Sequence, residues 1–177
     1  MEPKKRIVQE KLKDFLGDLG AKKSAPGGGS AAALSGALGI SLVQMVANFS
    51  VYPVKSPGTY GGGAAKPLFN RANSPQIREI LQKTRQIKKE LIKLIDEDAK
   101  AVSAFFQKEN SFSKRRRAKQ RMKNIPVKIF QNCEEGLKLI PYLAKKGNKN
   151  LLNDLRIARI LLKAGAKAAK ELTEMSN

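Results

Sequence analysis

The chain has 177 residues, which suits one domain, and we expect residues 1–177 to form a single unit with its own hydrophobic core. Its 35 Lys and Arg residues against 15 Asp and Glu residues give a formal net charge of +20, which favours anionic partners such as nucleic acid, acidic lipid or a polyanionic small molecule. Histidine is absent and Cys133 is the single cysteine, which excludes Ser-His-Asp and Cys-His catalysis, an internal disulfide, and a zinc site made of thiolates and imidazoles.

The N-terminal part of the chain predicts a helix. Apolar residues recur at helical spacing from Lys4 to Leu19, and Gly20 is a suitable residue to end the pattern. No charged leader followed by an apolar segment and a cleavage site is recognisable here. We therefore expect a cytoplasmic protein.

The second predicted helix runs from about Ser30 to Ser50, within a stretch that has no charged residue. Its length would allow it to cross a membrane, but Ala, Gly and Ser dominate it, and Gln44 and Asn48 share one face. A helix that is apolar on all sides is also typical of the centre of a soluble bundle. We expect an all-α helical bundle around this central Ala/Gly-rich helix, and no membrane contact.

The turn before this helix, "PGGGS", has two interpretations. Glycine is the usual residue where a chain needs a tight turn, so the run can be a turn and a helix cap. Alternatively, Gly28, Gly29 and Ser30 present free N–H groups at a helix N-terminus, which attracts a carboxylate, a phosphate or a carbonyl oxygen. The glycines alone do not decide between a cap and a binding site.

After a long loop predicted from Tyr52 to Ser74, the strongest periodic pattern runs from Pro75 to Phe106. Its apolar stripe comprises Ile77, Ile80, Leu81, Thr84, Ile87, Leu91, Leu94, Ile95, Val102, Phe105 and Phe106. Asp98 falls on this stripe, where burial would raise its pKa toward the range useful for proton transfer. Asp96 lies about 200° away around the helix. Either carboxylate could instead be structural, hydrogen-bonded to a helix cap or to a neighbouring lysine.

A fourth helical region covers about Ser113 to Lys146, and Pro126 and Pro141 are expected to start, kink or split it. It contains the basic run "KRRRAKQRMK", which looks like a nucleic-acid-binding patch but has no aromatic residues between its basic ones. We interpret the run as a solvated helix face and do not expect nucleic-acid binding. A non-catalytic nucleic-acid-binding protein is the alternative that the net charge suggests.

The last helix is predicted after "KKGNKN", in which a glycine ends one helix and asparagines cap the next. Its apolar stripe consists of Leu151, Leu155, Ala158, Leu162, Gly165, Ala169 and Leu172, with basic residues on the opposite side. Asp154, in the first turn, suits the helix dipole there.

Four blocks of the sequence, in order, resemble the formiminotransferase-cyclodeaminase C-terminal family, which includes stand-alone methenyltetrahydrofolate cyclohydrolases. The blocks are "DFLGDLGAKKSAPGGGSAAALSGALGISLVQMVAN", "LIDEDAKAVSAF", "NIPVKI" and "GNKNLLNDLRIA", and together they span nearly the whole chain. The resemblance implies an all-helical, oligomeric folate enzyme, at least a homodimer.

Two reactions are known in this family. Cyclohydrolases add water to 5,10-methenyltetrahydrofolate and open it to 10-formyltetrahydrofolate, whereas cyclodeaminases expel ammonia from 5-formiminotetrahydrofolate. We expect the cyclohydrolase reaction, because the chain has no formiminotransferase domain, and we keep the cyclodeaminase reaction as the alternative. No metal or other cofactor is expected beyond the tetrahydrofolate substrate, because the amidinium carbon is already activated toward water.

The resemblance also implies roles for individual residues. Asp98 or Asp96 would take a proton from the attacking water, and a carboxylate there would stabilise the cationic carbon. Substrate contacts are implied for Gly28, Gly29, Ser30, Lys55, Asn150 and Asp154, in a groove at a subunit boundary. Lys55 lies where family members carry a basic, glycine-containing turn, although that segment differs in this chain. The basic residues would attract the mono- or polyglutamate tail of folate.

Overall fold

The computed structural model describes residues 11–51 and 74–174, and these residues are almost entirely helical, with no strand among them. The elements are α1 (Leu12–Gly20), α2 (Gly28–Val51), α3 (Pro75–Phe106), α4 (Phe112–Lys146), the short 3-10 helix η2 (Lys149–Leu151) and α5 (Leu152–Glu174). The all-α prediction is confirmed. Of the first predicted helix, Lys4 to Leu19, only the part from Leu12 onward lies within the described residues.

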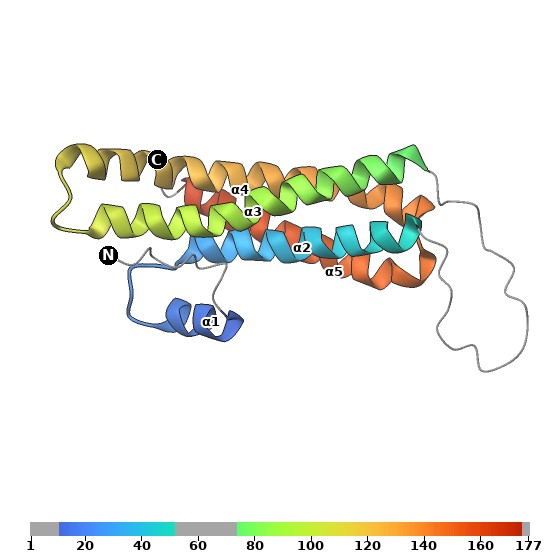
Figure 1. Ribbon diagram of the computed structural model, residues 1–177, viewed down its shortest axis with the longest axis horizontal. Helices are drawn as coiled ribbons and strands as arrows, with labels where there is room; N and C mark the ends of the chain where they lie inside the picture. Colours follow the sequence, from blue (N-terminus) through green and yellow to red (C-terminus); the bar gives the residue numbers. More distant parts are fainter. Residues whose placement is uncertain (1–10, 52–73, 175–177) are drawn as a thin grey trace, which may run out of the picture.

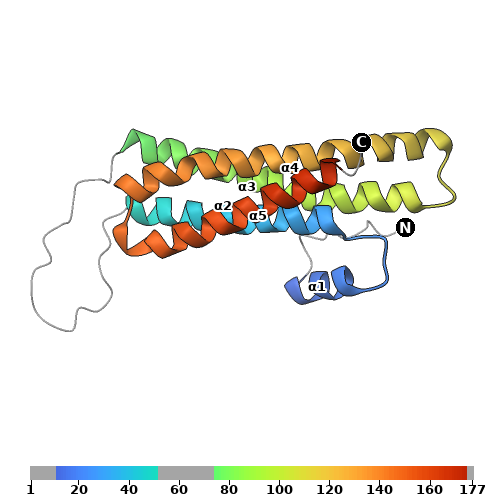
Figure 2. The ribbon, with the colours of Figure 1, turned by 180° about the vertical axis from the view of Figure 1, so that it is seen from behind.

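The four long helices, α2 to α5, lie side by side in an elongated bundle, and the short helix α1 lies outside it near the start of α2, with its Phe15 in the core cluster (Figure 1). α2 packs against α3, α4 and α5, which makes it the central helix that the sequence predicts. α3 and α4 form an antiparallel hairpin that extends well past the first residue of α2, as the reverse view also shows (Figure 2). Among the described residues, α3 and α4 alone therefore form this end of the bundle.

α2 is long and apolar enough to cross a membrane, judged by length and composition. Half of its 24 residues are nevertheless buried within the bundle. Glycine makes the approach of α5 possible, because a Cβ on Gly165 would lie 3.0 Å from the carbonyl oxygen of Ala32. The Ser35 hydroxyl also donates a hydrogen bond of 2.9 Å to the carbonyl of Leu161 in α5. This packing favours the bundle interpretation of α2 over the membrane one.

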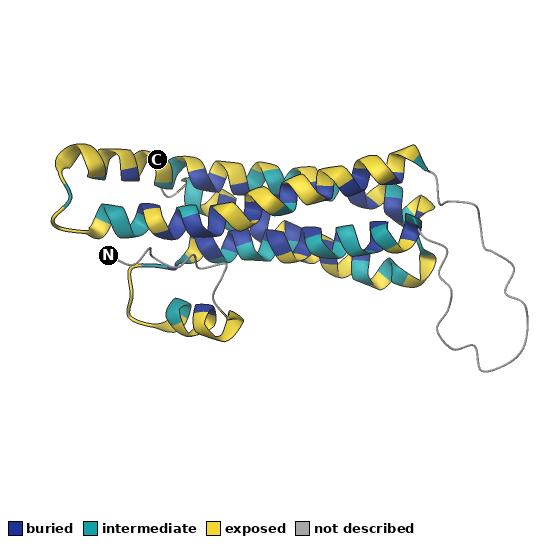
Figure 3. Cartoon of the chain, in the orientation of Figure 1, coloured by how far each residue is buried: buried dark blue, intermediate teal, exposed yellow. Residues whose placement is uncertain are grey.

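The apolar stripe of α3 is buried as predicted from Ile77 to Ile95, but its last members are not. Phe106 is 61% exposed, and Val102 and Phe105 are only half-buried. The expectation that these three residues continue the core is wrong, because α2 begins opposite Asp98 and does not extend beside the final turns of α3. Figure 3 shows the resulting exposed end of the hairpin.

α4 is one continuous helix through both of its prolines, so Pro126 and Pro141 neither start nor split it. An interior proline costs about 3 kcal/mol or more, because one backbone hydrogen bond is lost and the ring meets the preceding turn. Burial of apolar side chains on both sides of each proline offsets this cost. The buried side chains are Ile125, Ile129, Cys133, Leu139, Ile140 and Leu143. Cys133 is thus a core residue, and burial raises the pKa of its thiol to about 12.

The junction before α5 forms as the sequence predicts. The N–H of Gly147 donates to the carbonyl of Leu143 at 2.7 Å, and the side chain of Asn148 accepts from the N–H of Asn150 at 3.0 Å. The predicted stripe of α5 is buried at Leu155, Ala158, Leu162, Gly165 and Ala169.

Candidate active site

Asp98 of α3 lies against the first turn of α2. Its Oδ2 accepts two hydrogen bonds from Ser30, one of 2.8 Å from the backbone N–H and one of 2.9 Å from the hydroxyl. The Ser30 hydroxyl also lies 3.1 Å from the carbonyl oxygen of Ile95. Asp98 is only 6% exposed, and Ser30 is fully buried. Two residues that the sequence singled out separately therefore form one buried polar contact.

Gly29 explains why this turn contains glycine. A Cβ on Gly29 would lie 2.1 Å from Oδ1 of Asp98 and 2.5 Å from its Cγ, which are distances no side chain can occupy. The carboxylate can approach the α2 backbone only because residue 29 has no side chain. Close approach of a carboxylate is thus the specific reason for one glycine of "PGGGS".

Two opposing effects determine the protonation of Asp98. Burial is the larger one and raises the pKa of its carboxyl, because a buried carboxylate loses its hydration. The two hydrogen bonds from Ser30 act in the other direction, since they stabilise the ionised form, and the net pKa remains above the ordinary value. A buried carboxyl with a raised pKa at a helix N-terminus is suited to accepting and returning a proton.

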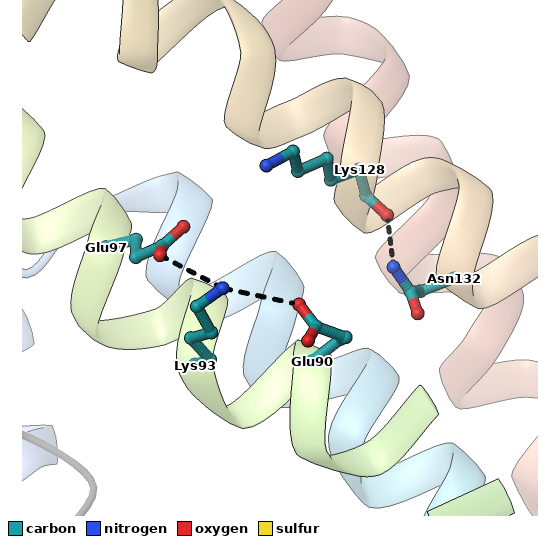
Figure 4. Close-up of polar contacts among 5 residues, drawn as sticks. All are labelled: Glu90, Lys93, Glu97, Lys128 and Asn132. Atoms are coloured by element: carbon teal, nitrogen blue, oxygen red, sulfur yellow. Dashed lines mark hydrogen bonds and ion pairs between the residues drawn. The ribbon is translucent and has the colours of Figure 1, made fainter. Parts of the chain in front are cut away.

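Asp96 is buried too, at 7% exposed, although its side of α3 differs from that of Asp98. Glu97, between the two aspartates, belongs instead to an ion-pair group. Its carboxylate lies 3.5 Å from the ammonium group of Lys93, which also contacts Glu90 at 3.7 Å (Figure 4). Lys93 and Glu90 are exposed and Glu97 is partly exposed, so the three side chains form an ordinary surface ion-pair group. Asp96 and Asp98 are therefore the buried carboxylates of this segment.

Four of the remaining predicted contact residues lie at opposite ends of the bundle, Gly28, Gly29 and Ser30 at one end and Asn150 at the other. Gly28, Gly29 and Ser30 lie beside Asp98, but both donors of Ser30 are engaged by that carboxylate. The N–H of Asn148 donates to the Ser50 hydroxyl at 2.9 Å, which places the turn containing Asn150 at the opposite end of α2. From the rise of a helix, Ser30 and Ser50 lie about 30 Å apart.

Asp154 is half-buried and lies between these two ends. The Cβ position of Gly39 is 3.0 Å from the Ala158 carbonyl oxygen, and Asp154 is one turn closer to the far end of α2 than Ala158. Its distance from Ser30 along the bundle is about 20 Å. One chain therefore does not bring Asp154 and Asn150 to Asp98. Lys55 lies outside the described residues.

α2 also has an exposed side that the sequence did not reveal. The α2 outer face, as we call it, consists of Ala31, Leu34, Leu38, Leu42, Met45 and Phe49, which recur at helical spacing. Leu38 and Phe49 are 51% and 50% exposed, and Ile157 and Ile160 of α5 are also exposed. One chain therefore covers α2 only in part.

Comparisons with known proteins identify relatives along almost the whole chain. Residues 11–175 match the family model described as formiminotransferase-cyclodeaminase. The methenyltetrahydrofolate cyclohydrolase of Methylorubrum extorquens is 28% identical over 171 residues, covering 90% of this chain and 76% of that protein. The mouse formimidoyltransferase-cyclodeaminase is 28% identical over 174 residues, covering 92% of this chain but only 30% of that protein.

The fold also has a counterpart among solved structures. The crystal structure of formiminotetrahydrofolate cyclodeaminase from Thermotoga maritima superposes with a TM-score of 0.77, covering 96% of this chain and 79% of that chain. At 23% sequence identity, this likeness shows that the helical fold is the same.

Proposed function

The chain belongs to the formiminotransferase-cyclodeaminase family, and on that premise we propose that it hydrolyses 5,10-methenyltetrahydrofolate to 10-formyltetrahydrofolate. The observation that carries the proposal is the buried Asp98 carboxyl, which has a raised pKa and is held by Ser30 at the start of α2. The similarity to a cyclohydrolase along 90% of this chain supports hydrolysis. The similarity to formimidoyltransferase-cyclodeaminases keeps ammonia release from 5-formiminotetrahydrofolate as the second candidate.

The proposed reaction begins with water attacking the methenyl carbon between N5 and N10. Asp98 takes a proton from that water as the carbon–oxygen bond forms, which gives a neutral tetrahedral intermediate. The carbon–N5 bond then breaks, Asp98 returns its proton to N5, and the intermediate hydroxyl releases its proton to solvent as the formyl group forms on N10. Because Ser30 holds Oδ2, Oδ1 is the oxygen that would carry the proton.

The electrostatics of this position suit the substrate. The methenyl bridge is a cationic amidinium, so an ionised carboxylate beside it lowers the energy of the bound cation and of the proton transfer. The step requires no metal or redox cofactor in this proposal, because the carbon is already electrophilic. The excess of basic residues in the chain would attract the glutamate tail of the same substrate.

Purified protein offered 5,10-methenyltetrahydrofolate should remove the absorbance of the methenyl form much faster than buffer does. The parallel assay with 5-formiminotetrahydrofolate should show slow or no release of ammonia. The two assays separate hydrolase from lyase directly.

Rapid ammonia release without hydrolysis would replace our assignment with the cyclodeaminase reaction. Failure of both assays, with folded protein confirmed by circular dichroism, would contradict the enzymatic proposal.

We further propose that the site is completed by a second copy of the chain. The α2 outer face exposes Leu38 and Phe49 and leaves its other apolar side chains half-buried, and an apolar surface of this kind marks an interaction site in soluble proteins. Leu38 lies near its middle. If two outer faces pack antiparallel across a two-fold axis at Leu38, residues at equal distances on opposite sides of Leu38 become level with each other.

This arrangement would bring Asp154 of one chain close to Asp98 and Ser30 of the other chain. Ser30 precedes Leu38 by eight residues, or about 12 Å along the axis. Asp154 lies about 8 Å beyond Leu38 in the other direction, as its position relative to Ala158 and Gly39 indicates. Asp154 of the partner subunit would therefore lie within about one helical turn of the level of Asp98 and Ser30, where it could orient the substrate.

Leu38→Glu should convert the assembled protein to monomers, measured by sedimentation velocity, because a carboxylate on the outer face cannot be buried against a second copy without a large desolvation cost. The matched control is Leu16→Glu on α1, since Leu16 is 53% exposed and Leu38 is 51% exposed. The control should sediment like the wild type. A monomeric wild-type protein, or equal behaviour of both variants, would contradict this interface.

Mixing two inactive variants tests the shared site. Asp98→Asn and Asp154→Asn should each have at least about tenfold lower activity alone. Co-folding them should restore about a quarter of the wild-type activity, because half of the dimers are mixed and each mixed dimer contains one intact site. If Asp98 and Asp154 act within one chain, mixing restores nothing.

A further inference from the structure

The end of the α3–α4 hairpin carries a concentration of positive charge. We call residues 100–123 the hairpin tip, and these residues include nine Lys and Arg side chains and one acidic side chain, Glu109. The hairpin tip projects beyond α2 and is exposed on most of its surface (Figure 3). The ion pairs recorded among residues 11–51 and 74–174 involve none of the basic residues of the tip. Its charge is therefore available to an external anion.

Aromatic side chains lie beside these charges, although the basic run itself contains none. Phe106, at the end of α3, is 61% exposed, and Phe112, at the start of α4, is 83% exposed. The ring of Phe106 packs edge-on against that of Phe105, with the centroids 5.2 Å apart. The turn of the hairpin thus supplies the aromatic residues that the sequence pattern lacked.

Charged and aromatic side chains line one groove of about 600 Å³ at the tip. Phe106 and Phe112 meet Lys108, Arg116 and Lys119 there. Arg115 is already used, because its guanidinium donates to the carbonyl of Lys108 at 2.7 Å and so closes the end of α3. A second groove, of about 310 Å³, is lined by Lys100, Lys114, Arg117 and Arg121. Basic side chains therefore surround this part of α4.

We propose that the hairpin tip binds single-stranded nucleic acid, a function separate from the reaction at Asp98. Phosphates would contact the basic side chains, and unpaired bases would stack on the exposed rings of Phe106 and Phe112. The rings favour this ligand over anions that have no flat rings. A duplex keeps its bases stacked inside, and a chain of carboxylates has no flat rings, so neither would cover the phenylalanines.

Fluorescence anisotropy with labelled 12-nucleotide RNA and DNA, each as single strand and as duplex, tests the proposal. The single strands should bind more tightly than the duplexes. Four phosphate contacts by the exposed basic residues of the tip predict a slope of log K against log salt of about −3. Comparison of the two single strands shows whether the tip prefers RNA or DNA.

Two variants locate the binding site. Arg116→Gln combined with Lys119→Gln should make the salt slope shallower by about 1.4, because two phosphate contacts are lost. The matched control is Lys163→Gln combined with Lys167→Gln on α5, which removes the same charge from exposed positions and should keep the slope. Phe112→Ala should weaken binding about tenfold, through loss of base stacking, without changing the slope.

Replacing Phe112 with tryptophan would give a direct fluorescence signal of binding, because the natural chain contains no tryptophan. Fluorescence of Phe112→Trp should be quenched by the single strand and not by an oligomer of γ-linked glutamate. The proposal is overturned if single strands do not bind, if duplexes bind equally well, or if the α5 control weakens binding as much as the tip variant. Equal displacement by γ-linked glutamate at equal charge would also overturn it.

Discussion

Replacing Asp98 with asparagine should lower turnover of 5,10-methenyltetrahydrofolate by about 10²- to 10⁴-fold, because the amide cannot carry the proton. Folding should not suffer. Asparagine keeps one oxygen to accept both hydrogen bonds from Ser30, and it removes a charge that is buried in the native state. Initial rates and thermal melting of the same preparation would separate the two effects.

Glu97→Gln is the matched control, because Glu97 is adjacent in sequence but partly exposed and paired with Lys93. Its turnover should remain within about twofold of the wild type. Full activity in Asp98→Asn, combined with a large loss in Asp96→Asn, would move the proton-carrying role to Asp96. Full activity in both variants would contradict the site.

The raised pKa of Asp98 predicts how the reaction rate and the stability of the protein depend on pH. The wild-type rate should fall on the acid side at a pH above the ordinary pKa of a carboxyl, because protonated Asp98 cannot accept a proton from water. A raised native pKa also means that stability decreases as pH rises from the ordinary pKa to the native one. Any gain in stability of Asp98→Asn should therefore be present at neutral pH and disappear in acid.

Gly29→Ala should damage both stability and activity. Its Cβ would lie 2.1 Å from Oδ1 of Asp98, so either the carboxylate must rotate away from Ser30 or α3 must move away from α2. Overpacking of this kind costs about 1–3 kcal/mol, and loss of the hydrogen bonds to Ser30 costs about 1–3 kcal/mol more. Urea denaturation followed by circular dichroism would measure the change in the free energy of unfolding.

Gly27→Ala is the control two residues away, because nothing lies within 4 Å of the Cβ position of Gly27. It should be much less destabilising than Gly29→Ala. Truncation of Asp98 to alanine in the Gly29→Ala background should recover stability but not activity, since it removes the clash together with the proton carrier. Equal stability of the two glycine variants would show that the observed approach of Asp98 to α2 does not exist in solution.

The sequence predicted the helices well because each has a repeated apolar pattern that depends only on neighbouring residues. Ser30 and Asp98 were both selected, one as a cap or binding residue and the other as a carboxylate on an apolar stripe. Their hydrogen bond was not predicted, because it depends on how α2 and α3 align, and the two residues are 68 positions apart. The sequence indicated where the helices form, but not how far α2 and α3 are shifted relative to each other along the bundle.

Two other features were hidden for related reasons. An apolar surface on every side of α2 gives no indication of which side remains exposed in a single chain, so the α2 outer face around Leu38 could not be identified. The stripe of α3 continues through Phe106, but its burial depends on where α2 begins. Likewise, Phe106 of α3 meets Arg116 and Lys119 of α4 only through the geometry of the hairpin.

The packing of α2 against α5 has a consequence for synthesis of the protein. Ser35 and Leu161, which join these helices, are 126 positions apart, and α2 is made first. At about 5–20 residues per second, the ribosome needs roughly 6–25 s to supply the partner surface. During this interval the uncharged α2 has no α5 to cover it, so the nascent chain should be a substrate for chaperones that bind apolar segments.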